Sequence, residues 1–370
     1  MVVLNVCIDN FYAFKNFQMN LTYPKKIVDS YIPDEHLDGR PNFRYKKVNI
    51  IMGANASGKT TLGFMLRNIF NFIAKKNYSF LTDTINDRTQ KASFSIDLVR
   101  KSNTLYRIAC TIAAKPDKNY ETGDVIVEVR KENIWLRDSY ESCVKRLENA
   151  PYAPCETYLE ELERVENLAW LFEFPQDTKR TLWFDSSDKK FPRVLENILK
   201  ALDSSVQKVE KSRDLKDAFV IRLRDTSIVL QKGTRFDADQ LSSGTKAGVE
   251  IAAVVSSLMQ GRNTFYYCDE KFSYIHSDIE KAILSIMVDC LRPNEQLFFT
   301  SHNTDLLDMN LPKHAFTFLR KDLTNTEQPI SCISASSLLK RNSDSLKNAV
   351  ENDLFSTAPA VDLIYAITEL

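Results

Sequence analysis

The chain has 370 residues, and its 49 Lys and Arg balance its 49 Asp and Glu, so the formal net charge at pH 7 is zero. This balance excludes a protein that binds nucleic acid as a generic polycation. With 44% hydrophobic and 26% charged residues, the composition is typical of a soluble globular chain with a buried core. No apolar run approaches the roughly 18 to 20 residues of a membrane span, and the N-terminus lacks the features of a signal peptide. We therefore expect a cytoplasmic protein without a membrane partner.

The seven cysteines do not indicate metal or redox chemistry. They include no C-x-x-C pair and have no histidine at zinc-ligand spacing, so no zinc site is predicted. Cys268 and Cys290 lie within apolar runs, where we expect free thiols that pack in the core as small hydrophobic side chains.

The first 75 residues predict a strand, a glycine-rich turn and a helix in succession. Residues 2–20 alternate apolar and polar side chains like a pair of edge strands, and the polar stretch 21–46 is predicted to be loop. Residues 48–52 form a short apolar strand. After the turn, apolar residues recur at helical spacing on one face, which predicts an amphipathic helix with the buried positions Leu62, Met65, Leu66, Ile69, Phe70 and Ile73.

The turn itself matches the phosphate-loop motif G-x-x-x-x-G-K-[ST] in the context that the motif requires. Its two glycines allow the backbone to curl, so that N–H groups and the helix N-terminus point at the phosphates of a nucleotide. Lys59 supplies a charge for the β- and γ-phosphates, and Thr60 places a hydroxyl on Mg²⁺. The residues predicted to bind the nucleotide are Gly53, Asn55, Ala56, Ser57, Gly58, Lys59, Thr60 and Thr61.

Two carboxylates follow the buried strand predicted at residues 264–268. Asp269 is expected to hold the Mg²⁺ shell. Glu270 is expected to polarise the attacking water as a general base, because phosphoryl transfer needs positioning and charge stabilisation. A further buried strand at 296–300 is followed by Ser301 and His302, and we expect these two residues at the same end of the sheet.

A second anion site is predicted at residues 241–245, which read Leu-Ser-Ser-Gly-Thr. Ser242 or Ser243 can cap the helix that follows, and a serine-glycine turn at a helix N-terminus binds anions. Because the loop at 53–60 already holds phosphates in the same chain, a second phosphate contact implies a second chain.

The order of these motifs resembles that of ABC-type ATPase heads. Residues 269–276 are similar to the D-E-x-x-x-x-L-H stretch of the OLD-like, RecF-like branch, and residues 296–308 are similar to its T-H-N-T-x-L-L-D stretch. Residues 9–15 also resemble this branch, which includes ATPases of bacterial phage defence. The resemblance implies an α/β P-loop NTPase fold: an ABC-ATPase-like head with a mixed central sheet flanked by helices and a mostly helical insertion.

The same resemblance implies roles for individual residues. The nucleotide would be ATP, with Lys59 and Thr60 at the phosphates and Mg²⁺, Asp269 at the metal and Glu270 as the base. His302 would sense the γ-phosphate. Ser243 and Gly244 would contact the nucleotide of the opposite protomer. No glutamine is assigned to the metal, since Gln90 merely precedes a strand.

We expect four segments along the chain: the N-terminal half of the head at 1–135, a helical insertion at 136–215, the C-terminal half of the head at 216–325 and a helical tail at 326–370. In the insertion, the acidic stretch from Glu156 to Glu166 predicts a solvated helix face or, alternatively, a docking surface. Pro192 opens a run with helical spacing. The insertion has no sustained heptads, so long coiled-coil arms of the SMC type are excluded.

The segment after His302 is too short for the TOPRIM nuclease domain that OLD proteins carry fused. The chain therefore resembles the ATPase component of two-gene systems, such as the PARIS-type anti-phage systems. This implies an Mg²⁺-dependent ATPase that forms a homodimer, or a larger oligomer, across two ATP molecules. It would control a separate nuclease or toxin effector in response to a phage trigger.

Two other function classes remain open. One is a RecF-like DNA-binding ATPase of repair or recombination. Neutral charge argues against it, because phosphate contacts need clustered Lys and Arg. The other is a transporter head, which would need a membrane partner that nothing in the sequence indicates.

Overall fold

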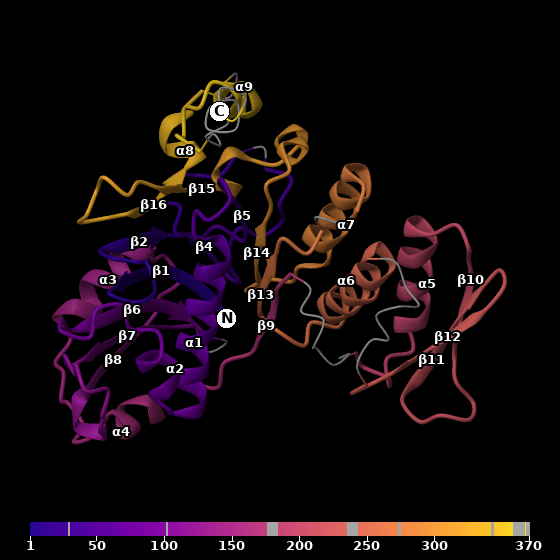
Figure 1. The fold of residues 1–370 in the computed structure, drawn as a ribbon. Coiled ribbons are helices and arrows are strands. Elements are labelled where there is room, and N and C mark those ends of the chain that lie inside the picture. Colours follow the sequence, from indigo (N-terminus) through magenta and orange to yellow (C-terminus); the bar gives the residue numbers. More distant parts are fainter. Residues whose placement is uncertain are drawn as a thin grey trace. The chain divides into compact units, whose positions relative to one another are not determined.

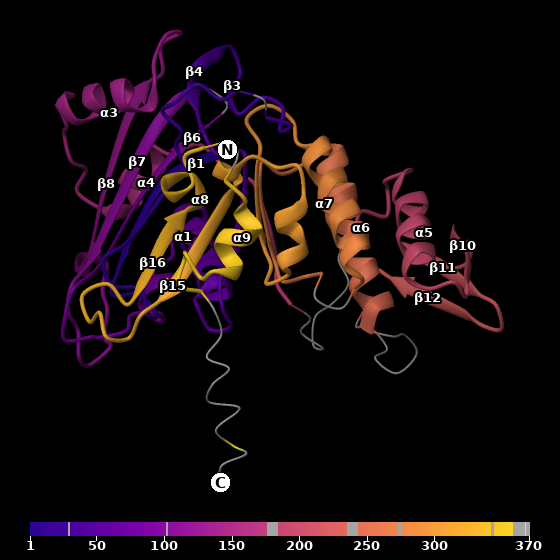
Figure 2. The ribbon, with the colours of Figure 1, turned by 90° about the horizontal axis from the view of Figure 1, so that it is seen from above.

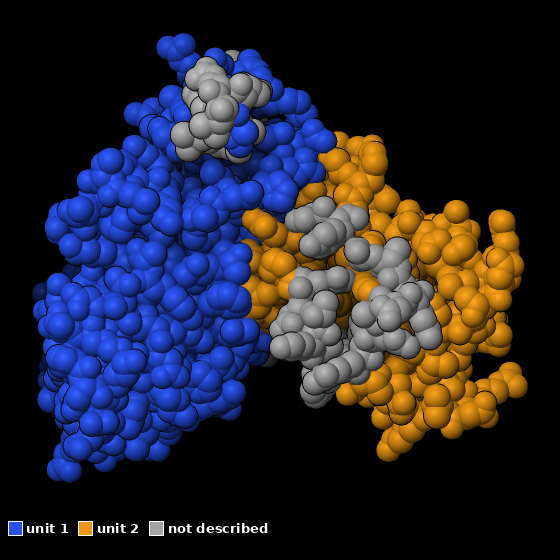
Figure 3. Space-filling view, in the orientation of Figure 1, with its two compact units in different colours: residues 1–170, 264–267, 293–370 blue, residues 171–263, 268–292 orange. Residues whose placement is uncertain are grey.

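The computed structural model describes residues 1–28, 30–100, 103–175, 184–234, 243–272, 275–341, 344–357 and 367, and of Ser243 it describes the backbone alone (Figure 1). The chain forms two compact units (Figure 3). Unit 1 comprises residues 1–170, 264–267 and 293–370. Unit 2 comprises residues 171–263 and 268–292.

Unit 1 contains a five-stranded antiparallel sheet with the order β2-β1-β6-β7-β8. Its strands are β1 (Val2–Asp9), β2 (Phe17–Asn20), β6 (Ala92–Val99), β7 (Thr104–Ile112) and β8 (Val125–Asn133). The buried face is apolar because side chains alternate across a strand, as in the row Val6, Ile96, Ile108 and Val129. The strand pair predicted for residues 2–20 is confirmed.

The prediction of loop throughout 21–46 is wrong at one hairpin. There β3 (His36–Leu37) pairs with β4 (Arg40–Arg44). Leu37 and Phe43 are buried in a cluster that includes Val2 and Leu4. Burial of these two apolar side chains against residues of another strand stabilises the hairpin. Local composition does not reveal such contacts.

A six-stranded mixed sheet has the order β16-β15-β5-β14-β13-β9. Its strands are β5 (Val48–Met52), β9 (Trp170–Glu173), β13 (Phe265–Asp269), β14 (Gln296–Thr300), β15 (Phe316–Lys321) and β16 (Ile330–Ser334). β5 runs parallel to β14 and β15, whereas β15 and β16 are antiparallel. Every residue of β5, β13 and β14 is buried, as expected for strands covered on both faces.

Helix α1 (Lys59–Lys75) contacts a strand of the five-stranded sheet and a strand of the six-stranded sheet. The Phe70 ring lies 5.2 Å from Phe265 of β13, and the Phe72 ring lies 6.1 Å from Phe94 of β6. All six apolar positions predicted for the helix face are buried. The other helices of this unit are α2 (Ser79–Thr82), η1 (Thr122–Asp124), α3 (Tyr140–Asn149), α4 (Tyr158–Glu163), η2 (Thr304–Asp308), η3 (Lys313–Ala315), α8 (Ala335–Leu338) and α9 (Leu346–Glu351).

The described residues of unit 2 form three helices and a small antiparallel sheet. The strands are β10 (Val206–Lys211), β11 (Ala218–Leu223) and β12 (Ser227–Gln231), and the helices are α5 (Phe191–Leu202), α6 (Ser243–Gln260) and α7 (Ser277–Cys290). Figure 2 shows α5 between α6 and these strands. Their common core includes Leu195 and Leu199 of α5, Phe219 of β11 and Val249 of α6. The helix predicted from Pro192 is confirmed.

The predicted insertion, residues 136–215, holds α3, α4 and α5 together with β9 and β10. Within the part of the chain that the structure describes, the segment between β9 and α6 contains α5 and three strands rather than a pair of long helices. No helix in the described ranges is long and apolar enough to cross a bilayer. Of the two cysteines expected in the core, Cys268 is buried and Cys290 is half-buried.

Candidate functional site

The backbone of the phosphate loop is shaped by residues with positive φ. Gly53 directly follows β5 and has a φ of +155°, and Gly58 caps α1 with a φ of +106°. A Cβ on Gly53 would lie 2.5 Å from the carbonyl oxygen of Leu319 and 2.7 Å from Ser57 Oγ. Ala56, with a φ of 60°, is also left-handed, and it is exposed like Asn55. Gly53 therefore occupies a position that no other residue fits.

The side chains of the loop fit a phosphate group. Lys59 is only 4% exposed, and its Nζ donates hydrogen bonds to the carbonyl oxygens of Gly53 at 2.9 Å and Ala54 at 3.2 Å. Ser57 is 3% exposed, and its Oγ has no hydrogen-bond partner within the described residues. Buried hydroxyls normally have a partner, so this one indicates a ligand. Thr60 and Thr61 lie in the first turn of α1, beside the positive end of the helix dipole.

His302 follows the strand that neighbours the loop strand. β5 and β14 are parallel, Thr300 pairs with Ile51, and the Ser301 N–H donates to the Ile51 carbonyl at 3.2 Å. Ser301 is buried, whereas His302 is exposed. The carboxyl ends of parallel strands meet at one edge of a sheet. The structure thus places His302 at the sheet edge from which the phosphate loop leaves, as the sequence predicts.

Asp269 is the last residue of the neighbouring strand β13, and Glu270 directly follows it. Asp269 is fully buried, and Glu270 is half-buried with a φ of 40°. A left-handed backbone is uncommon for a residue with a side chain, and it turns the chain sharply between the two carboxylates. Cys268, just before them, is buried, and burial raises the pKa of its thiol, so it is not a nucleophile. Asp269 and Glu270 belong to unit 2, whereas the phosphate loop and His302 belong to unit 1.

Tyr267 connects β13 to the start of α1 within unit 1. Its buried hydroxyl donates a hydrogen bond to the carbonyl oxygen of Lys59 at 2.6 Å, and its ring packs edge-on against Phe298 at 5.8 Å. No motif in the sequence includes this residue. A signal was present, because a tyrosine in a fully buried strand must find a partner for its hydroxyl.

The second predicted anion site lies at the start of α6. Ser243 and Gly244 are the first two residues of this helix, so Gly244 is placed in its first turn. Leu241, Ser242 and the Ser243 side chain lie outside the described residues, and so does the predicted serine cap. Ser243 and Gly244 belong to unit 2.

The Gln90 side chain forms a hydrogen bond within its own turn. It is exposed, and its Nε2 donates to Asp87 Oδ2 at 3.0 Å. Asn10 fixes the same turn through Nδ2, which donates to the Asp87 carbonyl at 2.7 Å. Another glutamine, Gln176, follows β9, the neighbour of β13 in the sheet order, and it lies outside the described residues.

No protein-family model matches the chain, and no curated protein matches it. Among solved structures, an Smc head bound to the C-winged helix domain of ScpA is 11% identical with a TM-score of 0.52, over 92% of this chain and 100% of that chain. The Pyrococcus furiosus Smc head domain with an extended coiled coil, bound to the C-terminal domain of ScpA, is 9% identical with a TM-score of 0.51, over 96% and 99%. The recombination mediator RecF reaches 0.43 at 10% identity, over 86% and 95%.

The likenesses to the two Smc head domains establish the fold. The chain has an α/β architecture like that of the two Smc head domains, with a mixed sheet. At such low identity they do not extend to activity, partners or individual residues.

Proposed function

We propose that this chain is an Mg²⁺-dependent ATPase that works as a switch. The observation that carries the proposal is the phosphate loop, where Gly53 leaves no room for a side chain and the buried Ser57 hydroxyl lacks a partner within the described residues. Lys59 would contact the β- and γ-phosphates of ATP, and the Thr60 hydroxyl and Asp269 would hold Mg²⁺. When bound, the metal ion neutralises charge on the phosphates.

Hydrolysis would depend on Glu270 and His302. Glu270 would accept a proton from the attacking water, and His302 would contact the γ-phosphate. His302 follows β14, which runs parallel to the loop strand β5, and this position supports its proposed role. The position of Glu270 directly after the buried Asp269 supports the division of work between the two carboxylates.

Head-to-head pairing of two chains would complete the site. The N-terminal turn of α6, with Ser243 and Gly244, is suited to an anion. Because each chain has its own phosphate loop, this turn would bind the nucleotide of a second copy. The homodimer, or a larger oligomer built from it, would then form with ATP and separate after hydrolysis.

The signal would pass to a separate protein. Both Smc heads with comparable folds are bound to a domain of another protein, ScpA. By the motif resemblance to OLD-like ATPases of phage defence, we infer that the partner here is a nuclease or toxin effector. A phage component would be the trigger.

Substitution of the base tests the ATPase. Glu270→Gln should keep ATP binding, lower turnover by about 10²- to 10⁴-fold and accumulate ATP-dependent dimers in sedimentation experiments. Lys59→Ala should lose binding. Lys75→Ala is the matched control, because this exposed lysine lies in the last turn of the same helix. Turnover of Glu270→Gln at the wild-type rate would refute the assignment of the base.

Capture of partners tests the switch. Tagged Glu270→Gln protein is recovered from its native cells with ATP and Mg²⁺, and the bound proteins are compared with those of Lys59→Ala by mass spectrometry. A nuclease-like or toxin-like protein enriched with the trapped form would support the defence role. Recovery of duplex DNA with replication factors, and a steep salt dependence of duplex affinity, would favour the RecF-like alternative.

A further inference from the structure

Lys271, the residue after Glu270, is a buried cation. It is only 3% exposed, which is rare for lysine unless the ammonium group is paired. Its Nζ donates a hydrogen bond to the Phe174 carbonyl at 2.8 Å. The same atom forms an ion pair with Glu250 and lies 3.9 Å from Glu173 Oε2.

These contacts join three segments of unit 2. Glu173 and Phe174 lie at the end of β9, Glu250 lies on α6, and Lys271 lies in the turn after β13. The side chains of Glu173 and Glu250 are 13% and 16% exposed, so all three charges are largely withdrawn from water. Removal of the lysine charge would leave two carboxylates close together without their cation.

The position of Glu250 on α6 gives this cluster a functional meaning. Glu250 lies seven residues after Ser243, which is about two helical turns, or roughly 10 Å along the axis. A helix moves as a rigid rod over this length. Any displacement of its first turn therefore reaches the Glu250 carboxylate and, through the ion pair, Lys271.

Glu270 directly precedes Lys271 in the chain. Its φ of 40° is costly for a residue with a side chain, so the neighbouring contacts must hold it in place. Lys271 is the adjacent residue, and its side chain is anchored at three points. The anchored side chain thus restrains the backbone on which the predicted base sits.

We propose that Lys271 is a positioning residue that couples the orientation of α6 to the conformation of Glu270. When the nucleotide of a second chain contacts the first turn of α6, the resulting change in α6 is transmitted to Glu270. Hydrolysis is therefore faster when the heads are paired. This inference rests on the proposed function, because it requires ATP turnover and pairing. It adds the internal connection through which pairing reaches the base.

The experiment measures how much pairing stimulates turnover. The ATPase rate per chain is followed as a function of protein concentration, from monomer to dimer, together with the affinity for ATP and the dimer fraction. Lys271→Met should bind ATP and form dimers, but the stimulation by pairing should fall by about 5- to 150-fold, the usual range of coupling between sites. Glu250→Gln should reduce the stimulation in the same way.

Two further variants separate positioning from mere stability. The exchange of charges in Lys271→Glu with Glu250→Lys should restore part of the stimulation that either single change removes. Arg222→Met is the matched control, because it removes an exposed ion pair with Glu210 in the same unit and should keep full stimulation. If Lys271→Met does not fold, as judged by circular dichroism, Glu250→Gln and the exchange variant carry the test.

The two proposals fail in different ways. A wild-type protein without ATP turnover would refute the proposed function. A wild-type protein that is stimulated by pairing, with folded Lys271→Met or Glu250→Gln stimulated to the same extent, would refute the coupling role alone.

Discussion

Gly53 lies at a point of the phosphate loop where the backbone of another strand leaves no room for a side chain. The nearest atom to a Cβ would be the carbonyl oxygen of Leu319 in β15, at 2.5 Å. A backbone oxygen within a sheet cannot rotate away as a side chain could. Gly53 therefore permits the backbone conformation of the loop, and Lys59 supplies its positive charge.

Gly53→Ala is expected to weaken ATP binding by about 5- to 150-fold. This corresponds to the roughly 1 to 3 kcal/mol that a strained backbone position costs. Isothermal titration calorimetry with ATP and Mg²⁺ gives the affinity. Gly123→Ala is the control, since a Cβ at Gly123 meets nothing within 4 Å. Equal affinities for Gly53→Ala and the wild type would show that the loop does not depend on this geometry.

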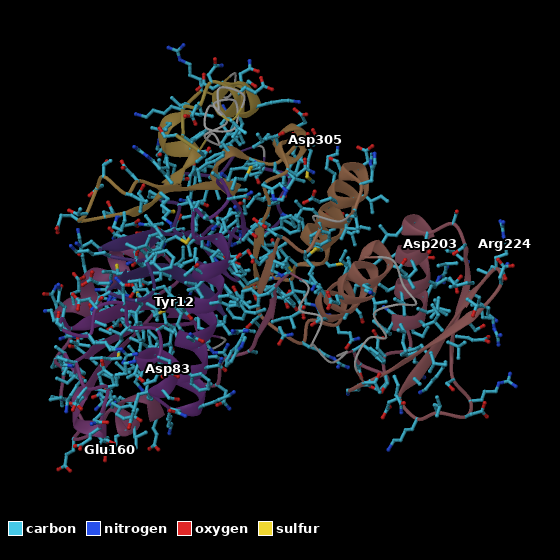
Figure 4. All side chains as sticks on the ribbon, viewed as in Figure 1. Tyr12, Asp83, Glu160, Asp203, Arg224 and Asp305 are labelled. Carbon is cyan, nitrogen blue, oxygen red and sulfur yellow. The ribbon has the colours of Figure 1, made fainter. Side chains whose placement is uncertain are left out.

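At the scale of elements, α4 shows how an acidic helix can be part of the core. Glu160 is exposed (Figure 4), but the next residue, Glu161, is 1% exposed. Its carboxylate accepts hydrogen bonds from the N–H groups of Val129 at 3.1 Å and Cys155 at 2.8 Å and from the Tyr152 hydroxyl at 2.9 Å. The prediction of a solvated face is wrong at this residue, because composition does not tell which glutamate turns inward.

The pKa of the Glu161 carboxyl is lowered from its ordinary value of 4.5: burial alone would raise it, but the hydrogen bonds from Cys155, Tyr152 and Val129 outweigh that effect. Because the folded pKa is lower than the unfolded one, the stabilisation by this carboxylate is complete above about pH 4.5. It is lost as the pH falls through the folded pKa.

Glu161→Gln should therefore lower the free energy of unfolding by about 1.5 to 3 kcal/mol at neutral pH, which is typical of a hydrogen bond to a charged group. The difference from the wild type should shrink below about pH 4.5. Urea denaturation at several pH values measures both effects. Glu160→Gln, at the exposed neighbour, should change little, and a deficit in Glu161→Gln that stays constant with pH would contradict this account.

The whole chain has a formal net charge of zero and folds as two compact units. Such a protein gains stability mainly from burial and from what it binds. The proposed function places ATP at the phosphate loop, which forms only in the folded chain, so ATP binding would favour the folded state by mass action.

ATP with Mg²⁺ at about one hundred times its dissociation constant should raise the free energy of unfolding by about 2.7 kcal/mol. Thermal unfolding with and without ATP measures the shift. Chelation of Mg²⁺ should reduce this shift in unfolding temperature, because ATP would then lose the contacts that the metal ion makes with the Thr60 and Asp269 oxygens. Lys59→Ala should show almost no shift, and a shift equal to that of the wild type would argue against binding at this loop.

Features of this protein that depend on short sequence spacing can be predicted without its structure. The phosphate-loop motif, the buried face of α1 and the strands β5, β13 and β14 are local patterns, and each lies where predicted, except that β13 begins and ends one residue later than expected. The positions of Lys59, Asp269, Glu270 and His302 relative to their strands follow from these patterns.

Contacts between side chains that are far apart in the sequence become apparent only in the folded chain. The Tyr267 hydroxyl donates a hydrogen bond to the carbonyl oxygen of Lys59, which is 208 positions away in the sequence. The Lys271 ammonium group donates to the carbonyl oxygen of Phe174, which is 97 positions away. The β3–β4 hairpin and the burial of Glu161 depend on partners that are likewise outside the local pattern. The spacing of residues along a helix or strand determines on which face of that element a side chain lies. The residue that the side chain contacts depends instead on which distant segment packs against that face.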